Sequence, residues 1–430
     1  MIYFDNNATT IMPTEVKKAM LDWCNRGNPS AGYASAKEAR AMMTELRKYI
    51  GLLCGIDTCC PESRDTSNKE ALLKAKKNPS NYKILFTSGA SEANCTVIYS
   101  VVDAYARATG KLPHIVVSAV EHKSIISAIK SYIERGIITA TFIQPTTSGH
   151  IKPEDVEKAI TNDTCLVCVM HANNETGAIN NIQKIGQIAH KYNVPYHCDT
   201  VQSFGKYPIS PIKDNVDSFC ISFHKLHGPP GIGALIIKQQ FLLGYNLQPI
   251  IFGSQNEGYR GGTENLPGIG AAFAATKLTM KNRKEKNILS LNIKKYIMSE
   301  LAKRIPTRQY TAYVVQNTKL PKNPSVEIVF LSGFNEYYLP NTLLLSVVKR
   351  IGKPICNVKM KDGLEKQGIV ISVGSACNTA DAKASHVLYA MGADDLIRKG
   401  ALRISLGDVN TMEEAKKFIQ EFLKIINQQM

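Results

Sequence analysis

Long apolar runs are missing from this sequence, and cysteine is scarce. No stretch approaches the ~18–20 apolar residues that a helix needs to cross a bilayer, so we expect no membrane-spanning segment. The N-terminus has neither the basic start nor the apolar stretch of a signal peptide. Only 11 of 430 residues are cysteine, which excludes a small disulfide-stabilised scaffold and favours reduced thiols. Together these absences predict a cytoplasmic protein.

Extremes of composition are also absent. Hydrophobic residues make up 44% of the chain and charged residues 20%, which excludes a disordered or fibrous protein. At about 150 residues each, about three domains are expected, although long α/β enzymes often have two. The chain has 52 Lys and Arg against 36 Asp and Glu, a net charge of +16. No nucleic-acid-binding motif or long basic block accompanies that charge, so we do not expect nucleic acid as the main partner.

Between residues 83 and 237, strand-like apolar runs alternate with helical patterns. Strands are predicted at 83–87, 115–118, 139–143, 165–170, 194–198, 216–222 and 234–237. Helices are predicted at 91–108, at 124–134, from Pro153, and at 182–192. This alternation is typical of an α/β fold with a mostly parallel, doubly wound sheet that helices cover on both faces. In such a sheet, ligands bind beyond the carboxyl ends of the strands.

The C-terminal part of the chain has a different pattern. A long Lys-rich helix is predicted over 271–301, followed by isolated strands at 326–331 and 369–373. Thr411 and Glu414 form a capping box, which predicts the start of a last helix.

Two segments read as loops or insertions. Residues 57–79 and 352–368 are rich in lysine and contain glycine or proline breakers. We predict a large domain at 15–284 and a smaller α+β domain made of 1–14 and 285–430.

A lysine stands at one of the predicted strand ends. Lys225 follows the strand at 216–222 and precedes a glycine- and proline-rich turn at 228–231. An amine in this place can form a Schiff base with a carbonyl cofactor. A lone lysine here is more often a surface residue beside a turn. Whether Lys225 belongs to a cofactor site therefore depends on the residues at the other strand ends.

Polar residues follow several other strands. Asp199 could hold a pyridinium nitrogen protonated or simply cap a helix. Residues 87–93 form a glycine turn and helix start that could bind phosphate or be an ordinary turn. His122 could stack on a ring, shuttle protons or be a loop residue, and segment 171–177 could be a turn or a hydrogen-bonding site. Since each group follows a separate strand, one shared pocket explains them better than coincidence.

These clusters and several others resemble the group I cysteine desulfurases of the NifS/IscS type, which are fold-type I pyridoxal phosphate (PLP) enzymes. The resemblance covers nearly the whole chain, in matching order and approximate spacing. It rests on YFDNNATT at 3–10, GNPS at 27–30, TSGASE at 87–92, EHK at 121–123, HANNETG at 171–177, HCDTVQS at 197–203, HK at 224–225, RGGT at 260–263, GSAC at 374–377 and RISLG at 403–407. It implies a fold-type I α/β architecture, PLP as the cofactor and L-cysteine as the substrate.

The resemblance implies a role for each matching residue at the cofactor. Lys225 carries the Schiff base and moves the substrate α-proton, Asp199 pairs with the pyridinium nitrogen, and Gln202 pairs with the ring hydroxyl oxygen. His122 stacks on the ring and assists proton transfer. The residues implied to hold the phosphate are Ala90, Ser91, Ser222 and His224. Thr263 reaches the phosphate in the neighbouring subunit, so a homodimer is implied.

The resemblance also assigns the substrate and sulfur chemistry. Asn174 and Arg403 bind the substrate carboxylate, Arg403 through a bidentate charged pair, and Asn174 also contacts the cofactor. Cys377 attacks, as a thiolate, the sulfur of PLP-bound cysteine, keeps it as a persulfide and releases alanine. Without the other motifs, Cys377 would be one thiol among 11.

The chain departs from the family pattern at a few positions. Ser91 replaces the usual threonine and keeps its hydroxyl, and Phe223 stands where related sequences have glycine. Tyr33 replaces an expected histidine. Segment 352–368 is longer than the family's connection and lies upstream of Cys377, where it could change which acceptor docks.

The expected activity is PLP-dependent conversion of L-cysteine to L-alanine, with the sulfur passed through a persulfide to an acceptor protein. That acceptor would be an iron–sulfur scaffold or a sulfur carrier, for cluster assembly or tRNA thiolation. The alternatives are another fold-type I PLP enzyme, such as a selenocysteine lyase, and a catalytically silent binding protein. No metal site is expected, because Cys54, Cys59 and Cys60 have no histidine nearby in the sequence.

Overall fold

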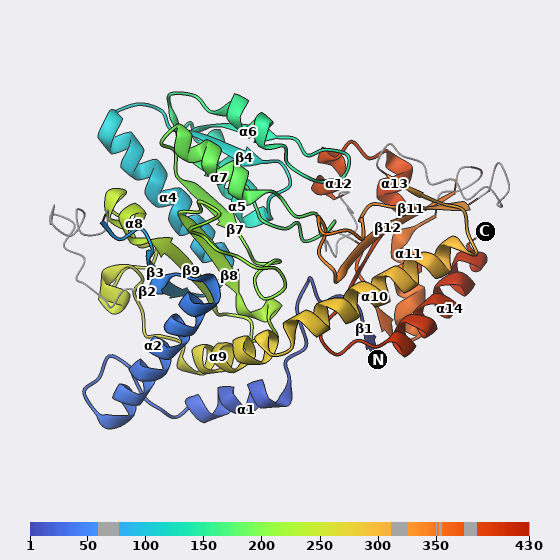
Figure 1. Ribbon diagram of the computed structural model, residues 1–430, viewed down its shortest axis with the longest axis horizontal. Coiled ribbons are helices and arrows are strands. Elements are labelled where there is room, and N and C mark those ends of the chain that lie inside the picture. Colours follow the sequence, from blue (N-terminus) through green and yellow to red (C-terminus); the bar gives the residue numbers. More distant parts are fainter. Residues whose placement is uncertain (59–76, 311–325, 350, 352–354, 374–384, 430) are drawn as a thin grey trace.

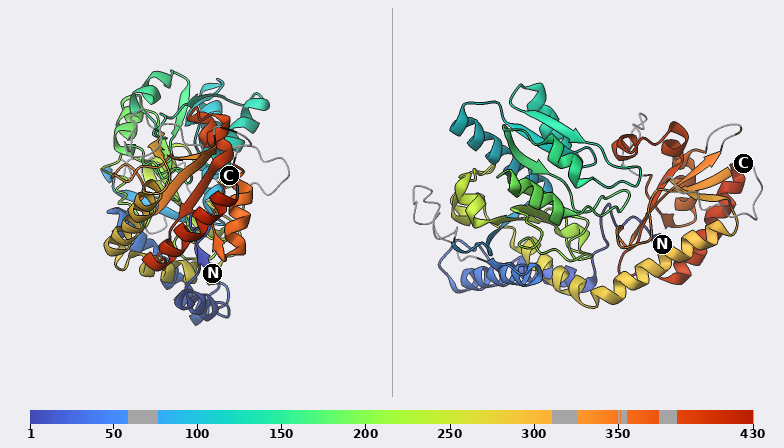
Figure 2. Two further views of the ribbon diagram at one scale, coloured as in Figure 1. Left: turned by 90° about the vertical axis from the view of Figure 1, so that its right-hand side faces the viewer. Right: turned by 45° about the horizontal axis from the view of Figure 1, so that its top comes forward.

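The computed structural model describes residues 1–58, 77–310, 326–349, 351, 355–373 and 385–429, which we call the described residues. They form a larger body, on the left of Figure 1, and a smaller body on the right. The long helix α10 (Arg283–Ala302) runs from the larger body to the smaller one, as the right-hand view of Figure 2 also shows. Both chain termini lie in the smaller body.

The larger body is built on an eight-stranded sheet with the order β2-β3-β9-β8-β7-β6-β4-β5. Its strands are β2 (Asp57–Thr58), β3 (Asn81–Thr87), β4 (His114–Ser118), β5 (Thr139–Ile143), β6 (Thr164–Cys168), β7 (Tyr196–Asp199), β8 (Ser218–Ser222) and β9 (Gly233–Lys238). Strand β9 runs antiparallel to both its neighbours, and the other pairs are parallel. The predicted mostly parallel sheet is confirmed.

Helices cover both faces of this sheet. In β8, Phe219 and Ile221 belong to one hydrophobic cluster and Cys220 to another. The first cluster includes side chains of α2 (Ala34–Cys54), α6 (Pro153–Ala159), α7 (Ile182–Lys191) and α9 (Leu266–Met280), and α1 (Thr14–Trp23) packs on α9. The second includes α4 (Ala90–Thr109), α5 (Lys123–Glu134) and α8 (Gln239–Gly244). A strand buried on both faces needs apolar side chains at consecutive positions, which explains the continuous apolar runs in the sequence.

The smaller body is built on a four-stranded sheet with the order β10-β11-β12-β14. Its strands are β10 (Thr307–Gln309), β11 (Val326–Phe330), β12 (Thr342–Lys349) and β14 (Ala401–Ser405), and its other helices are α11 (Asn357–Lys366), α12 (His386–Ala390), α13 (Asp395–Gly400) and α14 (Met412–Gln428). The chain begins here, because β1 (Ile2–Tyr3) pairs in parallel with β13 (Ile369–Val370). The next residues contact both bodies: Asn7 donates to Thr342 of β12, and Thr10 donates to the His224 carbonyl beyond β8.

The single helix predicted over 271–301 is wrong. Helix α9 ends at Met280 and α10 starts at Arg283, and between them Asn282 has a φ of 58°. Asparagine tolerates this left-handed conformation better than most residues, so the chain can leave one helix and enter the next.

The loop predicted over 352–368 is also wrong in its described part. Helix α11 occupies residues 357–366 and buries Met360 and Leu364, which lie one turn apart and pack with α14. Of the lysines in this helix, Lys361 lies between the two buried positions, and Lys359 and Lys366 flank them. Of segment 57–79, residues 59–76 lie outside the described residues. The domain boundaries near residues 14 and 284 stay a prediction.

Helices long and apolar enough to span a membrane do not occur in the described ranges. Within the same ranges, no three His, Cys, Asp or Glu side chains are grouped as metal ligands. The described cysteines are free thiols: Cys24, Cys54, Cys95, Cys165, Cys168, Cys198, Cys220 and Cys356.

Candidate active site

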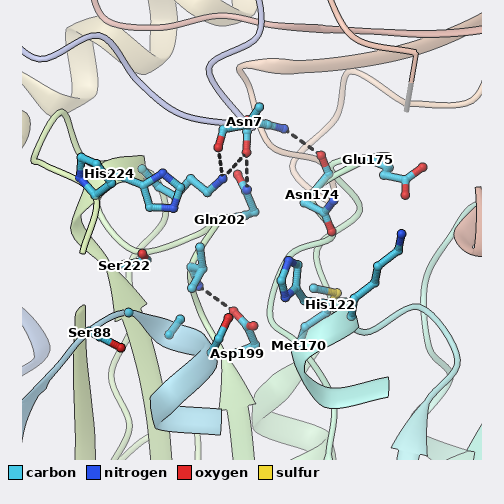
Figure 3. A pocket seen from close by; sticks show the side chains of 18 of the residues that line it. Asn7, Ser88, His122, Met170, Asn174, Glu175, Asp199, Gln202, Ser222 and His224 are labelled. Atoms are coloured by element: carbon cyan, nitrogen blue, oxygen red, sulfur yellow. Dashed lines mark hydrogen bonds between the residues drawn. The ribbon is translucent and has the colours of Figure 1, made fainter. Parts of the chain in front are cut away.

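A cavity of about 550 Å³ lies at the carboxyl ends of the strands of the larger sheet (Figure 3). The predicted residues that line it are Ala90, Ser91, His122, Asn174, Asp199, Gln202, Ser222, His224, Lys225 and Arg403. They come from the ends of β3, β4, β6, β7 and β8 and from β14 of the smaller sheet. Thr263 is exposed and is not part of this lining, and Cys377 lies outside the described residues. Phe223 is fully buried in the core beside α9 and does not line the cavity.

The turn between β3 and α4 suits a phosphate group. Helix α4 has 20 residues, Gly89 precedes it, and Ala90 and Ser91 form its first turn at the cavity wall. The first N–H groups of a helix have no partner inside the helix and carry the positive end of its dipole. Ser222 lies opposite this turn, because Thr87 and Ser222 both pair with Gly233 in the sheet.

Glu92 braces the same turn. Its carboxylate accepts a hydrogen bond from the Ser88 N–H at 2.6 Å and pairs with Arg260, with 2.9 Å between Nε and Oε1. Burial alone would raise the pKa of Glu92, but the hydrogen bonds from Arg260 and Ser88 bring it below its ordinary value. The Arg260 side chain, part of the RGGT motif, therefore acts on the phosphate turn through Glu92.

Gly233→Ala is expected to weaken PLP binding by displacing this turn. A Cβ at position 233 would lie 2.7 Å from both Cα and C of Gly89, closer than real side chains approach backbone. Overpacking of this kind costs about 1–3 kcal/mol, which corresponds to about 5- to 150-fold in affinity if the turn absorbs it. Titrating the apoprotein with PLP measures this, and Gly244→Ala is the control, because a Cβ there meets no atom within 4 Å. Equal PLP affinities for the two variants would contradict the expectation.

Lys225 ends a short 3₁₀ helix (Phe223–Lys225) directly after β8. Its Nζ donates to the Asn7 carbonyl at 2.7 Å and also to the Ala8 carbonyl. Burial, together with the positive charges of Arg403 and Lys206, lowers the pKa of Lys225 to about 7. A large fraction of this amine is therefore neutral near pH 7, which is the form that attacks a carbonyl.

Asp199 lies at the end of β7 and is buried. Its Oδ1 accepts from the Val201 N–H at 3.0 Å, and its Oδ2 accepts from Asn94 Nδ2 at 3.2 Å. The Asn94 oxygen in turn lies 2.9 Å from His197 Nε2 and 3.0 Å from the Cys220 thiol, which orients the amide. Burial lowers the pKa of His197 to about 4, so the ring is neutral at pH 7. Asp199 is thus a fixed carboxylate that can bind a protonated ring nitrogen.

His122 caps helix α5 and faces the cavity (Figure 3). Its Nδ1 accepts from the Ser124 N–H at 3.2 Å, so in the neutral ring the proton sits on Nε2. Burial lowers the pKa of His122, and the positive charge of Lys225 lowers it as well. A neutral ring next to Asp199 and Lys225 can stack on a cofactor or transfer a proton.

Arg403 forms the wall of the cavity on the side of the smaller sheet. Its Nη2 pairs with Asp5 Oδ1 at 2.7 Å, and its Nη1 donates to the Asn174 carbonyl at 3.0 Å. The side chain is only 4% exposed. The two Nη nitrogens of a guanidinium form the fork that a carboxylate binds when it takes the place of such contacts.

Several lining residues were not predicted as site residues. Asn7 belongs to the YFDNNATT motif at 3–10, on which part of the family resemblance rests. Its position over Lys225 depends on the chain crossing from the smaller body to the larger one. Glu175 also lines the cavity, and its Oε2 accepts from Ser385 Oγ at 2.5 Å. His386 lies beside them, with its Nε2 3.0 Å from the Glu121 carbonyl oxygen. The motif EHK contains Glu121, whose buried carboxyl has its pKa raised to about 8 by burial and whose Oε2 has no partner among the described residues.

The donor set of the cavity fits PLP part by part. The start of α4 suits the phosphate, Asp199 suits the ring nitrogen, and the Lys225 amine suits the aldehyde. The cavity volume of about 550 Å³ is in the range of pockets for molecules of this size.

Comparisons with known proteins show the family to which this chain belongs. The sequence matches the family described as Aminotransferase class-V over residues 69–418. It is 32% identical to the cysteine desulfurase IscS of Clostridium botulinum (strain Hall) over 430 residues, which cover 99% of this chain and 94% of that protein. The solved structure of a NifS-like protein is 28% identical, with a TM-score of 0.78 and 99% of both chains covered. The structure of SspA in complex with cysteine is 26% identical, with a TM-score of 0.69, and covers 94% of this chain and 99% of its own.

Proposed function

Because this chain belongs to the class V aminotransferase family and is a PLP-dependent cysteine desulfurase, we propose that it converts L-cysteine to L-alanine and keeps the sulfur on Cys377. The observation that carries this proposal is the single cavity in which Lys225, Asp199 and Arg403 meet. Its amine, carboxylate and guanidinium suit the aldehyde, the ring nitrogen and the substrate carboxylate, respectively.

Different residues at the cavity transfer the proton, bind the cofactor ring and bind the substrate carboxylate. PLP, when bound, withdraws electrons from the substrate carbon that carries the amino group. The neutral Lys225 amine can take the proton from that carbon and return it, with His122 as a second proton carrier. Asp199 holds the ring nitrogen, and the guanidinium of Arg403 exchanges part of its contacts with Asp5 for the substrate carboxylate.

Cys377 performs the sulfur step in this proposal. Its thiolate attacks the sulfur of the bound substrate, so that an S–S bond forms and the Cβ–S bond of the substrate breaks. The electron pair of the broken bond stays on Cβ, and a proton there completes alanine. The substrate sulfur remains on Cys377 as a persulfide. Support for this role comes from the GSAC motif at 374–377.

The sulfur then passes to an acceptor protein that serves iron–sulfur cluster assembly or tRNA thiolation. The enzyme acts as a homodimer in which Thr263, exposed in this chain, reaches the cavity of the partner. Phosphate binding across two subunits would explain why Gly262 and Thr263, at the end of the RGGT motif, are exposed. A cytoplasmic location is part of the proposal and is supported by the free described cysteines.

Product analysis with L-cysteine tests the proposed function. Without reductant, we expect about one alanine per active site and one sulfur retained on the protein, because the persulfide blocks further turnover. With dithiothreitol, alanine and sulfide should accumulate in equal amounts. L-serine is the matched control, since it offers the same amine and carboxylate without sulfur and should give no alanine. Turnover of L-selenocysteine with none of L-cysteine would favour the selenocysteine lyase alternative, and pyruvate in place of alanine would refute the proposal.

A further inference from the structure

Lys206 is a second lysine close to the cavity, on the far side of Gln202 from Asn7. It follows the turn after β7, where Gly205 has a φ of 79°. Its side chain lines a separate small cavity that Lys225 and Asp408 also line. No function was predicted for this lysine from the sequence.

The hydrogen bonds of Gln202 determine which way its amide points. Lys206 Nζ donates to Gln202 Oε1 at 3.4 Å, and Gln202 Nε2 donates to the Asn7 carbonyl at 3.1 Å. A lysine can only donate and a carbonyl can only accept, so one orientation of the amide satisfies both neighbours. The same Asn7 carbonyl accepts from Lys225 Nζ at 2.7 Å, which places the Gln202 N–H₂ group beside the reactive amine.

The charges around Lys206 keep it available for this contact. Asp408, the acidic group that acts on it, is already paired with Lys286 at 2.6 Å and lies 3.6 Å from His227 Nε2. Arg403 faces it with a like charge. Burial lowers the pKa of Lys206 to about 8, so most of the side chain remains protonated at pH 7 and donates strongly.

We propose that Lys206 is a positioning residue, which holds the Gln202 amide with its N–H₂ group toward the cofactor-binding cavity. The proposal rests on the proposed function and on the role that the family resemblance implies for Gln202, which is contact with the ring hydroxyl oxygen of PLP. A hydroxyl oxygen that has lost its proton can only accept, so an amide flipped by half a turn would present an oxygen to an oxygen. Lys206 prevents that flip from a position outside the cavity lining.

A double-mutant cycle on PLP affinity tests this role. Lys206→Met is expected to weaken PLP binding to the apoprotein about fivefold or more, and Lys206→Arg, which keeps the donor, is expected to restore most of it. In a Gln202→Ala background the Lys206→Met effect should largely vanish, because the amide that Lys206 orients is gone. Lys213→Met, the same change at an exposed lysine, is the control. Equal losses from Lys206→Met in both backgrounds would overturn the proposal.

A cofactor-free measurement keeps the test independent of catalysis. The positive charge of Lys206 contributes to the low pKa of Lys225. In apoprotein carrying Lys206→Met, the pH midpoint for acylation of Lys225, followed by peptide mass spectrometry, should therefore rise. An unchanged midpoint would show that the charge of Lys206 does not act on the Lys225 amine, and it would count against the proposal. If the wild-type protein bound no PLP, the proposed function itself would be refuted. If it bound PLP but Lys206→Met changed neither PLP affinity nor the midpoint, only the role of Lys206 would be refuted.

Discussion

Replacing Cys377 with serine is expected to abolish the formation of alanine from L-cysteine, with a loss of about a thousandfold or more. A serine hydroxyl does not ionise near neutral pH, and oxygen cannot replace the thiolate as the acceptor of the substrate sulfur. Cys377 lies between residues 373 and 385, and the described residues next to both of these ends contact the cavity wall. Ser372 exchanges two backbone hydrogen bonds with Arg403, and Ser385 donates to Glu175. Cys377 therefore belongs to a segment whose two described ends are fixed at the site.

The Cys377→Ser variant should still bind PLP, since none of the residues assigned to the cofactor is changed. The visible absorption of the bound cofactor is the readout for binding, and alanine release is the readout for chemistry. Cys24→Ser is the matched control, because Cys24 is an exposed thiol at the end of α1, away from the cavity lining. Normal alanine formation by Cys377→Ser would refute the persulfide mechanism.

Lys225→Ala is expected to lose both the covalent attachment of PLP and the proton transfer at the substrate. The loss of positioned proton transfer alone slows a reaction by about 10²–10⁴-fold. The protein should remain folded, because Lys225 is only half-buried and its hydrogen bonds go to two backbone carbonyls at the cavity. Lys225→Arg should fail as well, since a guanidinium keeps the charge but has no reactive amine. Undiminished turnover by either variant would contradict the assigned role.

The pH dependence of cofactor attachment follows from the same side chain. Burial and nearby positive charges bring the pKa of Lys225 from 10.5 to about 7. Protonation blocks the amine, so the rate of attachment to the apoprotein should rise with pH up to about 7 and level off above it. Stopped-flow absorbance after mixing apoprotein with PLP measures this rate.

The sequence predicted the larger sheet well because its strands are continuous apolar runs separated by clear helical periodicity. Most strands and helices between residues 83 and 237 lie within a few residues of their predicted positions. The pattern is weaker in the smaller body, where α11 combines two buried residues with three lysines, so that the sequence predicts a loop there. The break between α9 and α10 at Asn282 could not be predicted from the sequence either, because a single left-handed residue divides an otherwise continuous helical pattern.

The site could be predicted where it depends on single strand ends. Lys225, Asp199 and His122 each follow a strand, so a parallel sheet brings them together. Residues that reach the cavity through long-range pairing could not be placed this way. Asn7 lies over Lys225 because the N-terminal segment crosses from the smaller sheet. Arg403 reaches the cavity because its strand, β14, pairs with β12 in the smaller sheet. For Arg403 only the family resemblance supplied the assignment.

Borohydride reduction of PLP-supplemented protein is the most direct test of the central claim, which is a covalent bond between the Lys225 amine and PLP. Reduction fixes such a bond, and peptide mass spectrometry then locates it. The account predicts a reduced PLP adduct on the peptide that contains Lys225, close to one per chain. A protein that remains colourless with PLP and yields no adduct on Lys225 would contradict it.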